Sequence, residues 1–159
     1  MESKAKFLGH PIHQMLIVFP LGLLGASVFF DLAYRMLHIQ ALAEVAYWTQ
    51  VGGLIGGVVA APFGLIDWMA IPKGTRAKAI GALHGGTNVL VLLLFLASCL
   101  LRHEAEGHVS TVATALAIGG LAFSMVSAWL GGELVSRLGV GVSAKAHLNA
   151  PSSLREPWL

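Results

Sequence analysis

Long apolar stretches separated by short polar segments dominate the pattern along this chain. Four windows, residues 7–30, 45–66, 79–101 and 109–132, contain no Asp, Glu, Lys or Arg. Each is long enough to cross a hydrocarbon core, which takes about 20 helical residues, and none alternates like a barrel strand. We therefore expect an all-α fold, a four-helix transmembrane bundle with short loops over residues 1–138 and an irregular tail over residues 139–159. The helices are expected at about 11–36, 46–70, 79–102 and 109–135.

The composition supports a membrane protein. Hydrophobic residues make up 56% of the chain and charged residues 11%, whereas soluble domains have about 25% charged residues. The single cysteine, Cys99, excludes a disulfide framework and any cysteine-based zinc or iron–sulfur motif. We expect the first window to be retained, because Asp31 and Arg35 stand where a signal peptide would have its cleavage site. No basic stripe indicates a nucleic acid partner.

Basic residues predict the orientation of the bundle. Eight of the ten Lys and Arg residues precede the first helix, separate the second from the third, or follow the fourth. Positively charged loops stay in the cytoplasm. Both termini and the central loop are therefore expected to be cytoplasmic, and the other two loops to lie outside.

Proline, glycine and charge patterns predict local features of the helices. His10 is expected near the N-cap of the first helix with Pro11 at its first position, and Pro20 is expected to kink that helix. The pairs Gly52/Gly56 and Gly53/Gly57 predict close approach of a neighbouring helix. Asp31 and Arg35, four residues apart, predict an ion pair near the outer surface.

Every helix contributes a polar residue at the predicted cytoplasmic depth. Because the helices alternate in direction, residues early in the first and third share a leaflet with residues late in the second and fourth. Ionisable groups inside a membrane usually face the bundle interior and mark a site or one another's partners. The residues concerned are His10, His13, Asp67, His84, Asn88 and Glu133.

Three site chemistries remain open from these residues. A b-type haem would take two imidazoles from different helices, with His84 paired to His13 or His10 and glycines 81, 85 and 86 giving the porphyrin room. A divalent metal would draw on His13, His84, Asp67 and Glu133 together. A His–Asp pair could instead relay protons, and a purely structural role would have Asp67 accept a hydrogen bond from His84.

Four motifs resemble a known family. The stretches GHPIHQMLIVFPLG, GLIDW, GALHGGTN and GGELVSRLGVGV, in this order, are similar to those of a bacterial family of four-helix membrane proteins of unknown function, DUF2231. The resemblance covers Gly9 to Val142, and the motif histidines and aspartate fall on His10, His13, Asp67 and His84. Some relatives are fused to a Rieske-type domain, which implies traffic with membrane electron transport.

The resemblance and the polar residues together lead to a functional expectation. We expect a protein of the bacterial inner membrane, redox-associated and without enzyme activity of its own, with haem b or a divalent metal as the cofactor. His13, His84, His10, Asp67 and Asn88 are the expected cofactor residues. A separate redox protein, a larger membrane complex or a second copy of the chain is the expected partner. A structural or accessory bundle, or a metal- or proton-handling protein, is the alternative.

Overall fold

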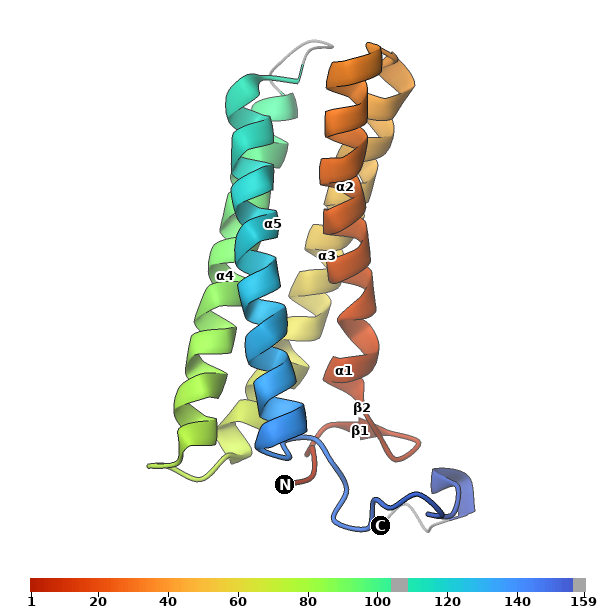
Figure 1. The fold of residues 1–159 in the computed structure, drawn as a ribbon, viewed down its shortest axis with the longest axis vertical. Coiled ribbons are helices and arrows are strands. Elements are labelled where there is room, and N and C mark those ends of the chain that lie inside the picture. The colour runs from red at the N-terminus through yellow and green to blue at the C-terminus, as the bar shows by residue number, and fades with distance from the viewer. Residues whose placement is uncertain (104–108, 156–159) are drawn as a thin grey trace.

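The computed structural model describes residues 1–103 and 109–155. Four long helical segments run up and down in an antiparallel bundle (Figure 1). The first consists of α1 (Ile12–Leu16) and α2 (Val18–Leu37), and it is followed by α3 (Gln40–Ala70), α4 (Arg76–His103) and α5 (Thr111–Gly132). All four are long and apolar enough to cross a membrane. The expected all-α four-helix bundle is confirmed; residues 156–159 of the expected tail lie outside the described residues.

Two of the helices begin earlier in the chain than expected. The helix α3 begins at Gln40 rather than near residue 46, and α4 begins at Arg76 rather than near residue 79. The apolar windows mark the part of a helix that lipid surrounds, whereas a helix continues into the polar boundary as long as its backbone bonds are made. The first helix instead begins one residue later than expected, because Pro11, with φ −62° and ψ 120°, is the N-cap of α1 and not its first helical residue.

A short hairpin leads into the first helix. Strands β1 (Lys6–Phe7) and β2 (His10–Pro11) pair antiparallel, with Phe7 opposite His10. The two turn residues, Leu8 and Gly9, both have positive φ, as a tight hairpin turn requires. The hairpin fixes the direction in which α1 enters the bundle.

The expected interruption of the first helix occurs at Ile17, between α1 and α2. Pro20 lies one turn further on and has no N–H to offer the carbonyl of Leu16. The helical bonding resumes at once, since Leu21 N donates to Ile17 O over 3.2 Å.

Glycines on α3 allow the neighbouring helices to approach closely, as their spacing predicts. A Cβ added at Gly53 would lie 2.7 Å from Leu24 Cγ of α2, and one at Gly57 would lie 2.6 Å from Leu92 Cδ2 of α4. Both distances are shorter than real Cβ contacts. The two faces of α3 therefore pack on α2 and α4 through backbone that carries no side chain.

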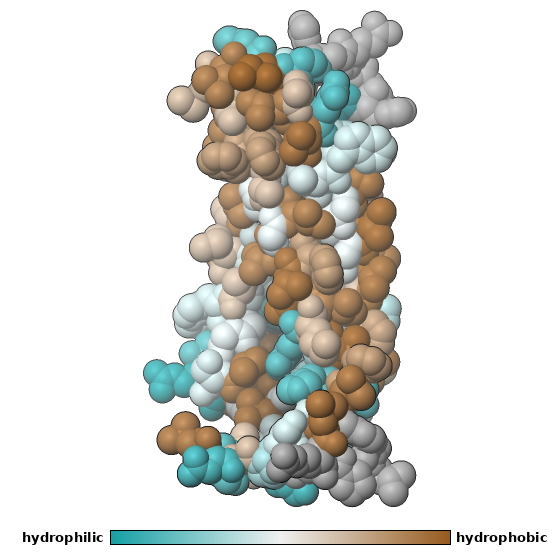
Figure 2. All heavy atoms as spheres, turned by 90° about the vertical axis from the view of Figure 1, so that its right-hand side faces the viewer, coloured by the Kyte–Doolittle hydropathy of each residue, from teal (hydrophilic) through white to brown (hydrophobic). Residues whose placement is uncertain are grey.

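On the face of the bundle that Figure 2 shows, apolar residues cover most of the middle and hydrophilic residues gather toward the two ends. Many large side chains on the outside of the bundle are exposed, among them Phe29, Val58, Leu93 and Met125. Inside, a small core of Leu, Val, Phe and Ala side chains packs around Phe95, which is fully buried. A surface that exposes so much apolar area is suited to lipid and not to water.

One ion pair differs from the expectation. Asp31 is fully buried, and its carboxylate takes both Nη atoms of Arg102 on α4, so the expected Asp31–Arg35 pair is wrong. Arg35 instead donates to Thr114 Oγ1 over 3.1 Å and to the Val109 carbonyl. The four-residue spacing places Asp31 and Arg35 as neighbours on one helix face. A buried carboxylate, however, pairs with a guanidinium that also faces the bundle interior and can form two hydrogen bonds to it.

Candidate functional site

Two of the expected site residues meet inside the bundle. His13 on α1 and His84 on α4 lie with their ring centroids 6.4 Å apart and their planes at 89°. Both side chains are half-buried. The helix α1, which carries His13, lies at the end of the bundle that holds both termini (Figure 1), and His84 lies about two turns from the beginning of α4.

The ring of His13 is held against α3. Its Nδ1 lies 3.0 Å from the carbonyl oxygen of Ala60. The ring rests on Gly64, where an added Cβ would come within 2.8 Å of Cε1 of the imidazole. Gly64 therefore provides the space that the ring occupies, and any larger residue would push the imidazole out of position.

The ring of His84 is held against α5 in the same manner. Its Nδ1 lies 2.9 Å from the carbonyl oxygen of Ser127 and 3.0 Å from the hydroxyl of the same residue. On the other side of the ring, Nε2 lies 3.1 Å from Nδ2 of Asn88. Gly131 of α5 faces the ring, since a Cβ there would lie 3.3 Å from Cε1.

These contacts assign the protons on both imidazoles. A carbonyl oxygen can only accept, so each Nδ1 carries the proton and donates it to the backbone. On His84, Nε2 accepts from the Asn88 amide, so this nitrogen presents a lone pair and the ring is neutral. A neutral imidazole with Nδ1 bound to a carbonyl is the form in which histidine ligates a metal or a haem iron.

Two close contacts join α3 and α4, one on each side of the histidines along the helix axes. Between these two contacts the space beside Gly85 is open. The upper contact is Gly57 against Leu92, and the lower is Gly81, where an added Cβ would lie 2.7 Å from Trp68 Cδ1. The two contacts are about three helical turns, or about 16 Å, apart on each helix at 1.5 Å per residue. Gly85 lies between them, is exposed and would meet nothing within 4 Å of an added Cβ.

The three glycines that were expected to give a porphyrin room, residues 81, 85 and 86, differ in what they face. Gly81 instead packs on Trp68, and an added Cβ at Gly85 or Gly86 would contact nothing. The glycines that touch the imidazoles belong to the facing helices, because a helical side chain points away from its own sequence neighbours.

Asp67 does not accept a hydrogen bond from His84, and this expectation is wrong. Both carboxylate oxygens lie 2.8 Å from the hydroxyl of Ser3, and Oδ1 accepts from the backbone N–H of Lys4 over 2.7 Å. Asp67 thus ties residues 3–5 to the end of α3. The Ala5 carbonyl in turn accepts from Ile12 N, so Asp67 acts on His13 only by anchoring the segment that precedes α1.

The remaining expected residues lie apart from the imidazole pair. Glu133, the first residue of the π-helical turn η1 (Glu133–Arg137), pairs with Arg76 at 2.8 Å. His10 is exposed on β2, and its Nε2 lies 3.2 Å from Ser153 Oγ of the short helix η2 (Ser153–Arg155). Within residues 1–102 and 109–154, whose side chains the structure describes, no three His, Cys, Asp or Glu side chains group to hold a metal ion. The structure does not bring the four expected metal ligands together.

Three residues of the site escaped the sequence reasoning. Ser127 and Gly131 lie in the apolar fourth window, and Gly64 lies two residues after Pro62. Their depth in the membrane, counted along each helix, is the signal that could have indicated them. Each lies at the same depth as a histidine on the facing helix, and Ser127 is buried.

Comparison with known proteins identifies the family. Residues 9–144 match the family described as predicted membrane protein (DUF2231), so the chain belongs to this family. Neither the curated proteins nor the solved structures include a match to the chain. The expected family is confirmed, and the protein is a membrane protein with four apolar helices.

Proposed function

We propose that this member of the DUF2231 family is a redox-associated subunit of the bacterial inner membrane in which His13 and His84 hold a b-type haem. The observation that carries the proposal is the pair of imidazoles whose Nδ1 atoms both donate to backbone carbonyls of other helices. This arrangement fixes the ring orientation and leaves both Nε2 atoms as the ligating atoms.

The distance between the rings fits this assignment. Two imidazoles on opposite sides of one metal ion, each bound at about 2 Å, have centres about 6 Å apart, and the observed separation is 6.4 Å. The open part of the α3–α4 seam, with Gly85 at its middle, supplies a site without side chains for a flat ring system. When bound, the haem would supply one-electron chemistry.

The chain's own residues would hold and tune the site. Ser127 and the Ala60 carbonyl orient the imidazoles, while Asn88 occupies Nε2 of His84 and must release that atom to a ligand. The surrounding apolar side chains exclude water.

The proposed orientation has both termini in the cytoplasm. The proposed partner is a separate redox protein, a larger membrane complex or a second copy of the chain. We propose no enzyme activity for this chain alone.

One observation favours a second function, a structural or accessory subunit. Both nitrogens of His84 have partners within the bundle, so its hydrogen bonds are satisfied with no cofactor. A site for a divalent metal has weaker support, because Asp67 and Glu133 are engaged elsewhere and only two imidazoles would ligate the ion. A proton relay also has weaker support. The expected His–Asp pair does not form, because Asp67 is bonded to Ser3, and only the two imidazoles of His13 and His84 lie together.

The absorption spectrum of the purified protein tests the proposal. We expect a Soret band that shifts on reduction, is absent in His84→Ala and is absent or weakened in His13→Ala. His10→Ala is the matched control and should retain the band, because His10 is exposed and bonded to Ser153. Elemental analysis that finds a divalent metal without a Soret band would replace haem with the metal. Folded protein with neither signal would support the structural subunit.

A further inference from the structure

The half of the bundle away from the histidines contains a cluster of buried polar side chains. All four long helical segments contribute to it, with Ser27, Asp31, Gln50, Ser98, Arg102 and Thr114. Polar groups inside a membrane are costly to bury unless each has a hydrogen-bond partner. Among the side chains that the structure describes, one buried nitrogen or oxygen atom lacks such a partner, and it is Oε1 of Gln50. The cluster is therefore short of one donor.

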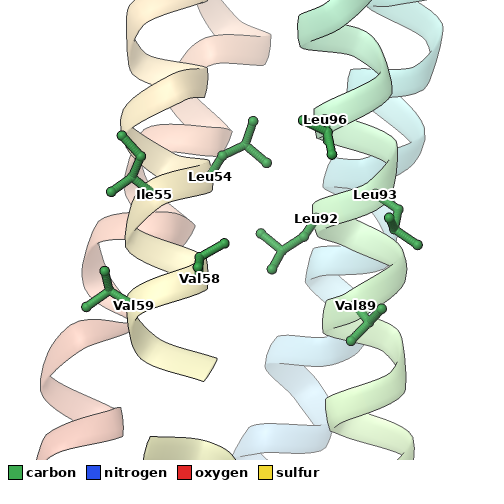
Figure 3. A pocket seen from close by; sticks show the side chains of 8 residues that line it. All are labelled: Leu54, Ile55, Val58, Val59, Val89, Leu92, Leu93 and Leu96. Carbon is green, nitrogen blue, oxygen red and sulfur yellow. The ribbon is translucent and has the colours of Figure 1, made fainter. Parts of the chain in front are cut away.

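The carboxamide of Gln50 is held from one side only. Its Nε2 donates to the carbonyl of Phe95 on α4 over 2.6 Å, and the side chain is fully buried. A carbonyl oxygen can only accept, so this contact assigns the nitrogen to the α4 side and turns Oε1 away from it. Leu54, one turn along α3, belongs to an apolar groove that only Leu, Ile and Val side chains line (Figure 3). That side of Gln50 supplies no donor either.

The packing of α2 on α3 places Ser27 at the level of Gln50. An added Cβ at Gly53 would lie 2.7 Å from Leu24 Cγ and 3.1 Å from Leu24 N, so Gly53 and Leu24 lie opposite one another. Because the two helices are antiparallel, three residues back along α3 and three forward along α2 lead in the same direction, by about 4.5 Å on each. These steps end at Gln50 and Ser27. Both side chains are fully buried, so both face the inside of the bundle.

The α2 side of the cluster offers acceptors at this level. The hydroxyl of Ser27 donates to the Leu24 carbonyl over 2.7 Å, which leaves its oxygen lone pairs to accept. One turn further along α2, the carboxylate of Asp31 has about four acceptor positions, of which Arg102 takes two. Gln50 Oε1 thus lies at the level of another acceptor. A molecule that bonds both oxygens has to donate to each of them.

Water is the small molecule with this chemistry. It can donate two hydrogen bonds at once, and a buried water typically makes about three bonds to polar groups that would otherwise be unsatisfied. A cation is disfavoured, because the guanidinium of Arg102 already lies in the cluster, with its Nε 3.4 Å from Ser98 Oγ. A larger polar molecule is disfavoured as well, since Ser27, Gln50 and Ser98 are all fully buried.

We infer that one water molecule is bound inside the bundle between Gln50 and Ser27, where it donates to Gln50 Oε1 and to Ser27 Oγ. The water joins α2 to α3, and the bond from Gln50 Nε2 continues the connection to α4. On α4, the buried apolar residues Val91 and Phe95 lie between His84 and this level. The water site is therefore separate from the imidazole pair and does not rest on the proposed haem.

Contact between Gln50 and water can be measured by NMR in the full chain. The sequence has three glutamines, Gln14, Gln40 and Gln50, so isotope labelling of the glutamine side-chain nitrogens, in protein reconstituted in lipid nanodiscs, gives three carboxamide signals. We expect a cross-peak to water at the Gln50 signal as well as at the signal of the exposed Gln40. The Gln50 signal is assigned by its loss in Gln50→Leu, or by elimination with Gln14→Leu and Gln40→Leu if that variant does not fold.

Two serine variants test the position of the water. Ser27→Ala removes one partner of the water, and Ser124→Ala on α5 is the matched control, because Ser124 likewise donates to the carbonyl three residues earlier over 2.7 Å. Ser27→Ala should weaken water binding about fivefold, the effect of one typical hydrogen bond, and reduce the Gln50 cross-peak, whereas Ser124→Ala should leave it unchanged. A Gln50 signal without a water cross-peak, beside a normal one at Gln40, would overturn the inference. Equal cross-peaks at Gln50 in the two serine variants would overturn it as well.

Discussion

Breaking the buried ion pair between Asp31 and Arg102 should destabilise the bundle more than any other single change of charge. Asp31 is 0% exposed and Arg102 is 8% exposed. The guanidinium makes two bonds to the carboxylate, with Nη1 2.5 Å from Oδ1, and its Nε lies 3.4 Å from Ser98 Oγ. Ser98 in turn donates to the Ala113 carbonyl over 2.7 Å, so the pair connects α2, α4 and α5.

The magnitude follows from what each variant leaves behind. Arg102→Leu leaves a buried carboxylate without a counter-ion, and removing one partner of a buried pair costs about 3–5 kcal/mol. The double variant Asp31→Leu, Arg102→Leu leaves no buried charge, and replacing a buried pair by apolar residues is often about neutral. We therefore expect the two single variants to be much less stable than the double variant, with a coupling free energy of about 3 kcal/mol or more.

Reversible unfolding in mixed detergent measures these free energies in a double-mutant cycle. Glu133→Gln is the matched control, because the Arg76–Glu133 pair has side chains that are 59% and 18% exposed and such pairs contribute about 0–1 kcal/mol. A coupling free energy below about 1 kcal/mol between Asp31 and Arg102 would refute the reasoning. It would show that water reaches the pair or that the helices are held together elsewhere.

Three further predictions concern packing, pH and orientation. Gly53→Ala should lower the unfolding free energy by about 1–3 kcal/mol, because the added Cβ overlaps Leu24. Gly22→Ala is the control and should be neutral or stabilising, because a Cβ there meets nothing within 4 Å. Equal effects of the two substitutions on the unfolding free energy would contradict the close contact at Gly53. Hydrogen bonds from Lys6, then Ser143 and Ala144, lower the pKa of Glu2 from its usual 4.5 to about 2, so these contacts stabilise the attached tail fully above pH 4.5 and are lost as the pH falls toward 2. Hydrogen exchange of the Ala144 amide, corrected for its intrinsic rate, should show this loss of protection in the native chain, and a Glu2→Gln variant should have no such transition. A reporter fused after residue 159 should be cytoplasmic and one inserted within residues 104–108 should be outside; the reverse result would refute the proposed orientation.

The sequence by itself determined the number, type and approximate extent of the helices. Lipid demands an uninterrupted apolar stretch of fixed length, so composition and hydropathy were sufficient for this. The glycine spacing on α3 was equally informative, because small residues four apart let a neighbouring helix approach closely in a membrane. The common depth of His13 and His84 followed from alternating helix direction, which is also a property of the linear pattern, whereas the contact of their rings is seen only in the structure.

The tertiary structure alone decided which polar groups pair. Asp67 and Glu133 lie at the expected end of the bundle, but a carboxylate takes the nearest donors, here Ser3 and Arg76, and no sequence pattern reveals those neighbours. The same holds for Asp31, whose partner lies 71 residues away in the chain. Hydrophobic periodicity fixes depth along the membrane normal, whereas the rotation of each helix about its axis depends on packing against all the others. Rotation decides whether two groups at one depth meet, and it therefore appears only in the folded bundle.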